Sequence, residues 1–405
     1  MSADGELRAL VSAMPVPELD GDPWTLPPEL ASARVAIVTT AGLYRRGEAA
    51  FDLFDQSFRL LPADDRDLIV GHNSLNFDRT GVLADLNVVF PIDRLVELAN
   101  AGAIGSVAPR HVSFMGAQMD TLATITLDTG PAAAAALRDD GVDVAVITTV
   151  CPFCPRTACA IARALEANGI ATVVLNSIRS FAERMRPPRA LYCEFPIGRP
   201  LGRPDDPPFQ RRVLERALGL LDRASGPVLE DFGEAITDDV DDALTCPLPP
   251  RTDPFLPPSV DEAQGLRGAF ERGSTGGLSS VEDPEAVYAA LAAFERVVAG
   301  TPWPEAGIEP NPMRAAGLIS AYYQQAAVGL AEHVPLARQA ESWYSRDTAA
   351  AATMRRAQQA MQEQGAPEPI WFYLLPVTQQ GITPPSMRTV TTHISADTAS
   401  RPKGA

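Results

Sequence analysis

The chain has little positive charge, few cysteines and no long apolar run, and each shortage argues against a class of protein. Its 405 residues carry 34 Lys and Arg against 51 Asp and Glu, and this net charge of −17 repels phosphate backbones and anionic membranes. No run approaches the ~20 apolar residues that span a bilayer. Residues 1–20 do not show the basic and then apolar pattern of a signal peptide. These absences predict a cytoplasmic protein that binds neither nucleic acid nor membrane.

Cysteine is scarce, and two of the cysteines stand close together. The five cysteines are too few to form a disulfide framework in a chain of this length. Cys151 and Cys154 form a Cys-Pro-Phe-Cys motif between an apolar run of strand length at 144–150 and a helical pattern at 158–167. This order aims the sulfurs at a helix N-terminus, where the macrodipole favours the thiolate. The sequence therefore predicts thiol chemistry, with Cys151 as the nucleophile and Cys154 as the resolving thiol.

Other uses of the motif stay open at this point. The two cysteines could be a buried inert pair or half of a zinc site, although zinc requires a second pair of ligands at suitable spacing, and no metal is predicted. The motif also looks like that of a glutaredoxin-like thiol-disulfide exchanger, but it lies about 150 residues into the chain and no Thr-Val-Pro turn follows it. A third alternative is a non-catalytic assembly subunit that works through its C-terminal region.

Strand patterns alternate with helical patterns from residue 34 to residue 223, which predicts an α/β fold with a mostly parallel, Rossmann-like sheet covered by helices on both faces. Functional sites in such sheets lie in loops at the carboxyl ends of strands, where the Cys-Pro-Phe-Cys motif falls. Beyond this region, helical spacing is seen at 284–299, 313–333 and 336–364, and the aromatic run 370–375 is expected to be a strand. The predicted organisation is a Pro-rich lead-in at 1–33, a reductase-like α/β domain at 34–245, a Pro-rich linker at 246–258, a helical region at 259–380 and a flexible tail at 381–405.

Two histidines and three other residues are candidates for the site. His72 ends a predicted strand and begins a polar loop, which suits an acid or a substrate ligand, although a loop histidine bonded to backbone is an equal alternative. His111 begins a strand, and taken alone a structural role is favoured. Asp78 and Asn87 cluster between the two histidines, and Gly116 falls in a predicted turn.

A series of short matches in one order supports a family resemblance over the first 230 residues. They comprise 37–42 (Ile-Val-Thr-Thr-Ala-Gly), 57–59, Gly71-His72 with Asp78, 85–94, 107–109, His111, 114–116, 140–143, the Cys-Pro-Phe-Cys motif, 166–173 and the helix around Gln210. In these matches the chain resembles the selenoprotein subunit of D-proline reductase and the wider glycine/sarcosine/betaine reductase selenoprotein B family. Cys151 stands in that family's selenocysteine position and Cys154 in its cysteine position. The region beyond about residue 259 is not covered by the resemblance.

The resemblance implies a thiol-dependent oxidoreductase that acts on a small amino-acid-like substrate. In the family, the selenolate attacks the carbon next to a carboxylate, the amine leaves, and the neighbouring thiol resolves the adduct. We predict acid/base or carboxylate-binding roles near the motif for His72 and His111, and substrate contacts for Asp78, Asn87 and Gly116. No cofactor is expected in this chain; an external dithiol supplies electrons, and a pyruvoyl group is expected on a partner subunit. The chain is expected to work with that partner subunit or as a homo-oligomer.

Overall fold

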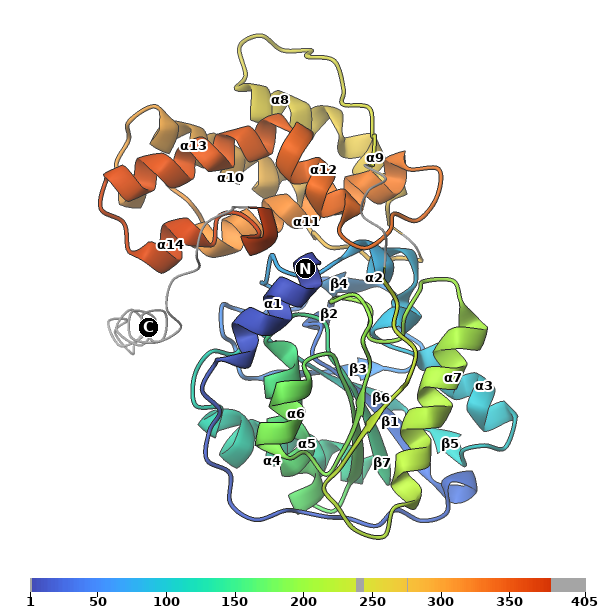
Figure 1. The fold of residues 1–405 in the computed structure, drawn as a ribbon. Coiled ribbons are helices and arrows are strands. Elements are labelled where there is room, and N and C mark those ends of the chain that lie inside the picture. The colour runs from blue at the N-terminus through green and yellow to red at the C-terminus, as the bar shows by residue number, and fades with distance from the viewer. Residues whose placement is uncertain (1, 238–243, 275, 380–405) are drawn as a thin grey trace.

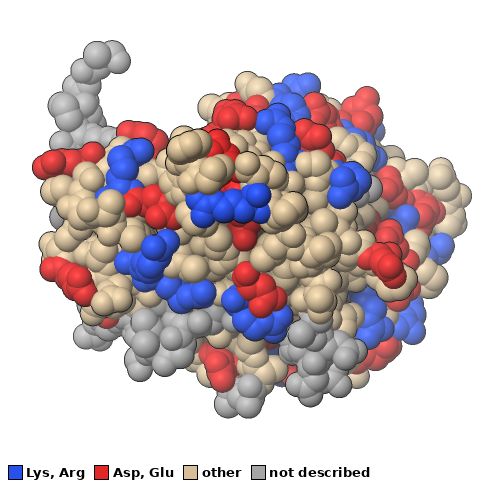
Figure 2. All heavy atoms as spheres, turned by 90° about the horizontal axis from the view of Figure 1, so that it is seen from above, with Lys and Arg blue, Asp and Glu red and all other residues tan. Residues whose placement is uncertain are grey.

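The computed structural model describes residues 2–237, 244–274 and 276–379. Within these residues, an α/β layer forms one part of the molecule and a bundle of helices lies against one end of it (Figure 1). The α/β fold with a helical C-terminal region, predicted from the alternating patterns, is confirmed. Acidic and basic side chains are interspersed on the face seen in Figure 2. None of the helices in the described residues is long and apolar enough to cross a bilayer.

The main sheet of the described chain has eight strands in the order β10-β9-β8-β7-β1-β6-β3, with β5 beside the start of β1. All neighbours are parallel except β3 and β6. The strands are β1 (Arg34–Thr39), β3 (Phe58–Pro62), β5 (Ser106–Val107), β6 (Arg110–Phe114), β7 (Val144–Thr148), β8 (Ala171–Asn176), β9 (Arg189–Tyr192) and β10 (Val228–Asp231). Buried β-branched and apolar residues dominate β1, β7 and β8, as expected for strands covered on both faces.

Helices cover both faces of this sheet (Figure 1). One face packs against α4 (Gly130–Asp139), α5 (Cys154–Ala167) and α6 (Arg179–Met185). The other face packs against α3 (Ile92–Asn100) and α7 (Pro207–Leu218). At the carboxyl end of the strands, β2 (Leu43–Arg45) pairs with β4 (Leu68–Val70), and the short helix α2 (Thr80–Ala84) lies within the loop that was expected to be irregular. This end of the sheet faces the helical region.

The helical region has its own apolar core. Its helices are α8 (Pro258–Gly265), α9 (Arg267–Arg272), α10 (Pro284–Val298), α11 (Pro312–Leu330), α12 (Gln339–Asp347), α13 (Ala349–Glu363) and α14 (Glu368–Phe372). The helical pattern at 336–364 is present as two helices, which meet at Thr348, whose extended backbone and side chain cap α13. The strand predicted at 370–375 was wrong, because residues 370–372 belong to the helix α14. Pro367 precedes this helix, Pro369 suits its first turn, and Phe372 is buried against its neighbours.

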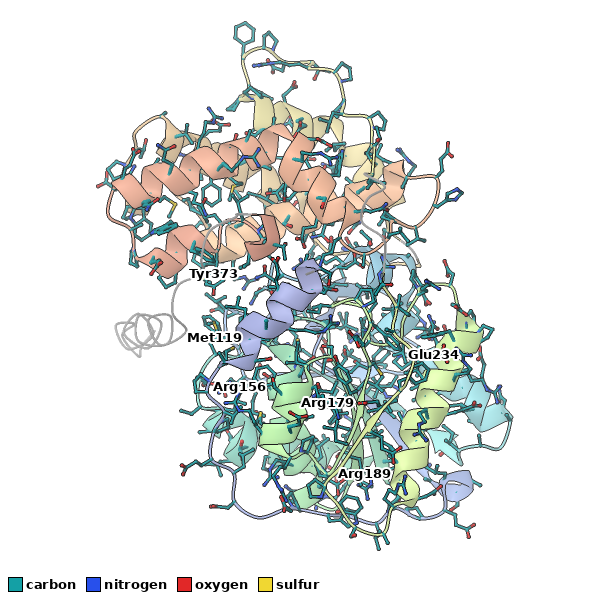
Figure 3. The ribbon with its side chains drawn as sticks, in the orientation of Figure 1. Met119, Arg156, Arg179, Arg189, Glu234 and Tyr373 are labelled. Atoms are coloured by element: carbon teal, nitrogen blue, oxygen red, sulfur yellow. The ribbon has the colours of Figure 1, made fainter. Side chains whose placement is uncertain are left out.

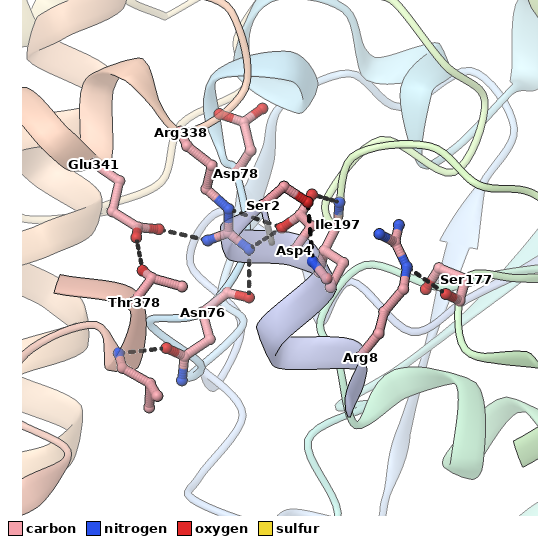
Figure 4. A network of polar contacts seen from close by, with 12 residues as sticks. Ser2, Asp4, Arg8, Asn76, Asp78, Ser177, Ile197, Arg338, Glu341 and Thr378 are labelled. Carbon is pink, nitrogen blue, oxygen red and sulfur yellow. Dashed lines mark hydrogen bonds and ion pairs between the residues drawn. The ribbon is translucent and has the colours of Figure 1, made fainter. Parts of the chain in front are cut away.

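The expected loosely packed lead-in begins instead with a helix, α1 (Ala3–Ser12), which buries Leu7 and Val11. Figure 4 shows how α1 joins the two parts of the molecule. Asp4 accepts a hydrogen bond of 2.9 Å from the backbone N–H of Ile197 in the α/β part. It also forms an ion pair of 2.7 Å with Arg338 in the helical region. The α1 helix therefore fixes the helical region over the strand ends. The flexible tail predicted at 381–405 lies outside the described residues.

Candidate functional site

The two cysteines of the motif lie at the carboxyl end of β7. Helix α5 begins at Cys154, and Cys151 precedes it, so the predicted strand-turn-helix arrangement is present. Both side chains are fully buried, and their Sγ atoms lie 3.1 Å apart. This separation is longer than a disulfide bond of ~2.05 Å but shorter than an ordinary sulfur contact, so oxidation to a disulfide requires only a small movement. Both cysteines are free thiols in this structure.

His72 is the nearest titratable neighbour of the pair. It follows β4, and its Nε2 lies 3.2 Å from the Sγ of Cys154. Its Nδ1 accepts a hydrogen bond from the backbone N–H of Ser74 at 3.1 Å, so Nε2 is left to donate toward sulfur. The ring also packs edge-on against Phe77. The polar loop after β4 therefore fixes the orientation of this imidazole toward Cys154.

The surroundings separate the acidities of the two thiols. Burial by itself raises the pKa of Cys154, but the hydrogen bond from Cys151 and the charge of His72 outweigh it and hold the pKa well below its usual value. Burial and the neighbouring Cys154 raise the pKa of Cys151 well above its usual value. The pair therefore holds its first negative charge on Cys154, while Cys151 keeps its proton.

Gly116 forms a wall of this site. A Cβ atom at Gly116 would lie 2.4 Å from the Sγ of Cys154 and 2.7 Å from the Cβ of Thr40, closer than atoms can approach. The backbone O of Gly116 accepts a hydrogen bond from Thr157 of α5 at 2.8 Å. Among the candidates named from the sequence, His72 and Gly116 thus lie against the thiols.

The other candidates lie in polar networks of their own. Asp78 is buried and pairs with Arg199 at 2.7 Å; burial by itself raises the pKa of Asp78, but Arg199 and hydrogen bonds from Thr80 and Gly81 bring it below its usual value. Asn87 bonds to Asp85 and Asp93 at the start of α3. No described contact joins either side chain to the thiols, and their substrate-binding role stays a prediction.

His111 lies within the sheet, in β6. Its Nδ1 accepts a hydrogen bond from the backbone N–H of Ile37 at 2.9 Å, and its ring packs edge-on against Phe90. Burial lowers the pKa of His111 to about 4, so the ring is neutral at physiological pH. No described contact joins it to either cysteine, and its acid/base role stays a prediction.

Arg79 is a residue of the site that the sequence interpretation did not single out. It is 1% exposed, and its Nη2 donates to the backbone oxygens of His72 and Ser74 at 2.7 Å each. Its charge also interacts with Cys151. The sequence showed only an arginine after Asp78 in a loop without periodicity, and the one available signal was its distance of seven residues from His72.

Two cavities adjoin the site where the α/β part meets the helical region. A cavity of about 390 Å³ is lined by His72 and, across from it, by Glu282 and Arg314. A smaller one, about 50 Å³, is lined by Ser74, by Phe153 of the motif and by other mostly apolar side chains. Met119 and Tyr373, which also line the smaller cavity, mark its position in Figure 3. Both cavities lie next to residues that contact the thiols.

In the described chain, His72, Cys151 and Cys154 form the group whose ligand atoms lie close enough to hold a metal ion, all within 4.8 Å. Two thiolates and an imidazole are a ligand set of catalytic zinc sites, with a fourth position open. Two sulfurs bound to one tetrahedral zinc would lie ~3.8 Å apart at Zn–S distances of ~2.3 Å. The observed 3.1 Å is shorter and fits direct sulfur-sulfur chemistry better.

The fold and the paired thiols define an α/β protein with a Cys-x-x-Cys site at the carboxyl end of a parallel sheet. The chain is 33% identical over 216 residues to "D-proline reductase subunit gamma" of Acetoanaerobium sticklandii, covering 52% of this chain and 88% of that protein. It is 28% identical to "Sarcosine reductase complex component B subunit beta" of Peptoclostridium acidaminophilum and 26% identical to "Glycine reductase complex component B subunit gamma" of Carboxydothermus hydrogenoformans. The chain therefore belongs to this family of reductase subunits.

The matches cover about half of this chain. The chain spans about half the length of the sarcosine and glycine reductase subunits. No family model and no solved structure matches the chain. The resemblance seen in the sequence is confirmed.

Proposed function

We propose that the protein is a reductase component in which Cys151 and Cys154 reduce a small amino-acid-like substrate and become a disulfide. The observation that supports this most is the separation of 3.1 Å between two buried Sγ atoms, one of which faces His72. Membership in a family of reductase subunits supports the same reaction class. The electrons come from the two thiols, and an external dithiol restores them.

In the first step, Cys151 gives its proton to the thiolate of Cys154, which lies within hydrogen-bond distance, and becomes the nucleophile. It attacks the carbon next to the carboxylate, forming a sulfur-carbon bond as the carbon-nitrogen bond breaks, and the protonated amino group leaves as a neutral amine with the electron pair of that bond. Cys154 then holds the proton, and the Nε2–H of His72, 3.2 Å from that sulfur, stabilises the thiolate that forms when this proton leaves.

In the second step, the thiolate of Cys154 attacks the sulfur of Cys151. The sulfur-sulfur bond forms, the sulfur-carbon bond breaks, and the carbon keeps the electron pair and takes the proton that Cys154 releases. The product is a carboxylate whose adjacent carbon carries hydrogen in place of nitrogen, and the thiols have lost two electrons. Thiolate character on Cys154 suits this resolving role, and it is Cys154 whose pKa the site lowers.

The proposal includes a partner subunit, because the relatives are named as subunits of D-proline, sarcosine and glycine reductases. A pyruvoyl group on that partner would activate the amine before this chain acts. Cysteine is a weaker nucleophile than selenocysteine, so activation of the leaving group carries more of the reaction here.

Mass spectrometry of the intact protein with and without a dithiol tests the proposal. We expect a change of about 2 Da, for two hydrogen atoms, that maps to a Cys151–Cys154 disulfide. Cys151→Ser and Cys154→Ser should each abolish this change, while Cys193→Ser, at a buried cysteine outside the motif, should keep it. Formation of the disulfide with turnover of disulfide substrates alone would favour a thiol-disulfide exchanger. Absence of the disulfide and retained partner binding in both variants would favour an assembly subunit.

A further inference from the structure

The side chain of Arg79 is buried with most of its hydrogen-bond donors unused. A guanidinium carries five N–H bonds, and the two on Nη2 point at the backbone oxygens of His72 and Ser74. Nε and Nη1 carry the other three, and neither atom has an acceptor among the described residues. The guanidinium also stacks over Phe77, 4.3 Å from the ring centre. An unmatched buried donor is costly, so this arrangement requires an explanation.

Three other buried arginines of the described chain each form an ion pair with a carboxylate. Arg199 pairs with Asp78 at 2.7 Å, Arg338 pairs with Asp4 at 2.7 Å, and Arg189 pairs with Glu166 at 2.6 Å. No such carboxylate contact is seen for Arg79 in the part of the chain that the structure describes. Holding the two backbone oxygens does not require a positive charge. The charges of Glu341, Cys151 and Asp78 act on Arg79 from a distance, but no described carboxylate forms an ion pair with it.

The unused donors lie next to the chemistry. Arg79 bonds to the backbone of His72, whose Nε2 faces Cys154, and its charge interacts with Cys151. Ser74, the other acceptor of Arg79, lines the smaller cavity together with Phe153, which stands between the two cysteines in the motif. Arg79 itself does not line either cavity, so an anion must pass Ser74 to reach its unused donors, and it would then lie beside the thiols.

We propose that Arg79 is the receptor for the substrate carboxylate and orients the adjacent carbon toward Cys151. The inference rests on the proposed function for the direction of attack. A carboxylate accepts strong charge-assisted hydrogen bonds from a guanidinium and supplies acceptors for the unused donors on Nε and Nη1. A carboxylate is also small enough to reach the N–H groups of Arg79, which the loop after β4 and α11 enclose. Gln324 of α11 accepts a hydrogen bond from the backbone N–H of Arg79. The carboxylate thereby fixes which carbon meets the sulfur.

Alkylation with iodoacetate and with iodoacetamide tests this proposal in the reduced full-length protein. In both reactions the sulfur-carbon bond forms as iodide leaves, but only iodoacetate carries a carboxylate on the attacked carbon. We expect the rate ratio of iodoacetate to iodoacetamide at Cys151, mapped by peptide mass, to exceed that of free cysteine by at least tenfold. The iodoacetate rate should saturate, and acetate should compete with it while acetamide should not.

Arg79→Met should lower this ratio to the value for free cysteine, and Arg79→Lys should restore part of it. Arg314→Met, which removes a cation from the rim of the larger cavity, should leave the ratio unchanged. A purely structural role for Arg79 would slow both reagents equally, so an unchanged ratio overturns the proposal. An equal fall in both methionine variants overturns it as well, because it would indicate general electrostatic attraction.

Three further outcomes would overturn the assignment. Stronger competition by inorganic phosphate than by acetate would contradict a carboxylate ligand. A linear iodoacetate rate without competition in the unmodified chain would contradict a binding site, even where Arg79→Met does not fold. No reaction of either reagent at Cys151 would show that a small carboxylate does not reach it. All of these are read on reduced protein, so they are independent of whether Cys151 and Cys154 form a disulfide.

Discussion

Two buried charged clusters lie at opposite ends of the same sheet and differ in how well their charges are matched. At the amino end, Glu166 pairs with Arg189 at 2.6 Å and accepts backbone N–H groups of Thr25 and Thr172. Arg189 also donates to the backbone oxygen of Thr25 and stacks 3.6 Å from the ring of Trp24. Its position at the lower end of the molecule is seen in Figure 3. The charges of this cluster are paired and fasten the lead-in to the sheet, while Nε of Arg189 and Nε1 of Trp24 have no hydrogen-bond partner among the described residues.

The cluster at the carboxyl end is left open. It contains two thiols in contact, an imidazole aimed at one of them, and a guanidinium with unused donors. Matched buried charges contribute to a folded state, whereas unmatched ones weaken it and persist where a ligand or a reaction needs them. The comparison therefore assigns stability to the amino end and chemistry to the carboxyl end.

The strongest test of this contrast is to remove each arginine in turn. Arg189→Met leaves Glu166 buried without its cation and should lower the free energy of unfolding by about 3–5 kcal/mol. Arg79→Met removes a charge that has no described carboxylate partner but leaves two backbone oxygens without their donor, so it should lower this free energy less, by about 1–3 kcal/mol. Urea denaturation of both variants measures the difference. Equal losses in the two variants would contradict the assignment of different roles to the two ends.

A second test concerns the space around Cys154. Gly116→Ala places a Cβ against the sulfur and against Thr40, so we expect a loss of about 1–3 kcal/mol in unfolding free energy and a much slower formation of the disulfide. Gly219→Ala is the matched control, because nothing lies within 4 Å of an added Cβ there. Thermal denaturation and dithiol-dependent mass measurements provide the two readouts. Unchanged disulfide formation in Gly116→Ala would show that the contact does not restrict the thiols.

The sequence predicts the local parts of this site better than their assembly. The strand, the motif and the helix after it form one continuous pattern, so the positions of Cys151 and Cys154 at the carboxyl end of a parallel strand could be predicted. The contact of His72 with Cys154 spans 82 residues, and only the fold creates it. Arg79 lies in a loop without periodicity, where unused donors become visible only when every neighbour is placed.

Elements outside the sheet show the same limit. The aromatic run at 370–375 has strand composition, yet proline in the first turn and packing against the helical region produce α14. Helix α1 was missed because its stability depends on burying Leu7 and Val11 and on ion pairing of Asp4 with a residue more than 300 positions away. Tertiary contacts decided both elements, and neither contact is encoded in the local pattern.

A third test separates His111 from the catalytic end by its response to pH. Its pKa is about 4 when folded and ~6.5 when unfolded, so the unfolded chain binds the proton first as the pH falls. The contribution of this group to stability is complete above pH ~6.5 and is lost as the pH falls toward 4. We expect the contribution of His111 to the free energy of unfolding to fall by about 2 kcal/mol between pH 7 and pH 5.

His111→Gln should flatten this part of the stability curve in urea denaturation. Of the charges that act on this ring, Arg66 favours the neutral form and Asp140 the charged form, and both are kept in the variant. The same slope in the variant and the unmodified protein would assign the pH dependence to other groups.

The smallest expected effect is kinetic and tests whether His72 makes the carboxyl end reactive. His72→Gln removes the charge that favours the thiolate of Cys154, so the reaction of that thiol with iodoacetamide at pH 7 should slow by about tenfold. The difference should vanish at alkaline pH, where both proteins carry the thiolate. His111→Gln should leave the rate unchanged, since no described contact joins that ring to the thiols. Equal rates for His72→Gln and the unmodified protein at pH 7 would show that the 3.2 Å contact orders the loop without activating sulfur, and the reactive cluster would then consist of the thiols and Arg79 alone.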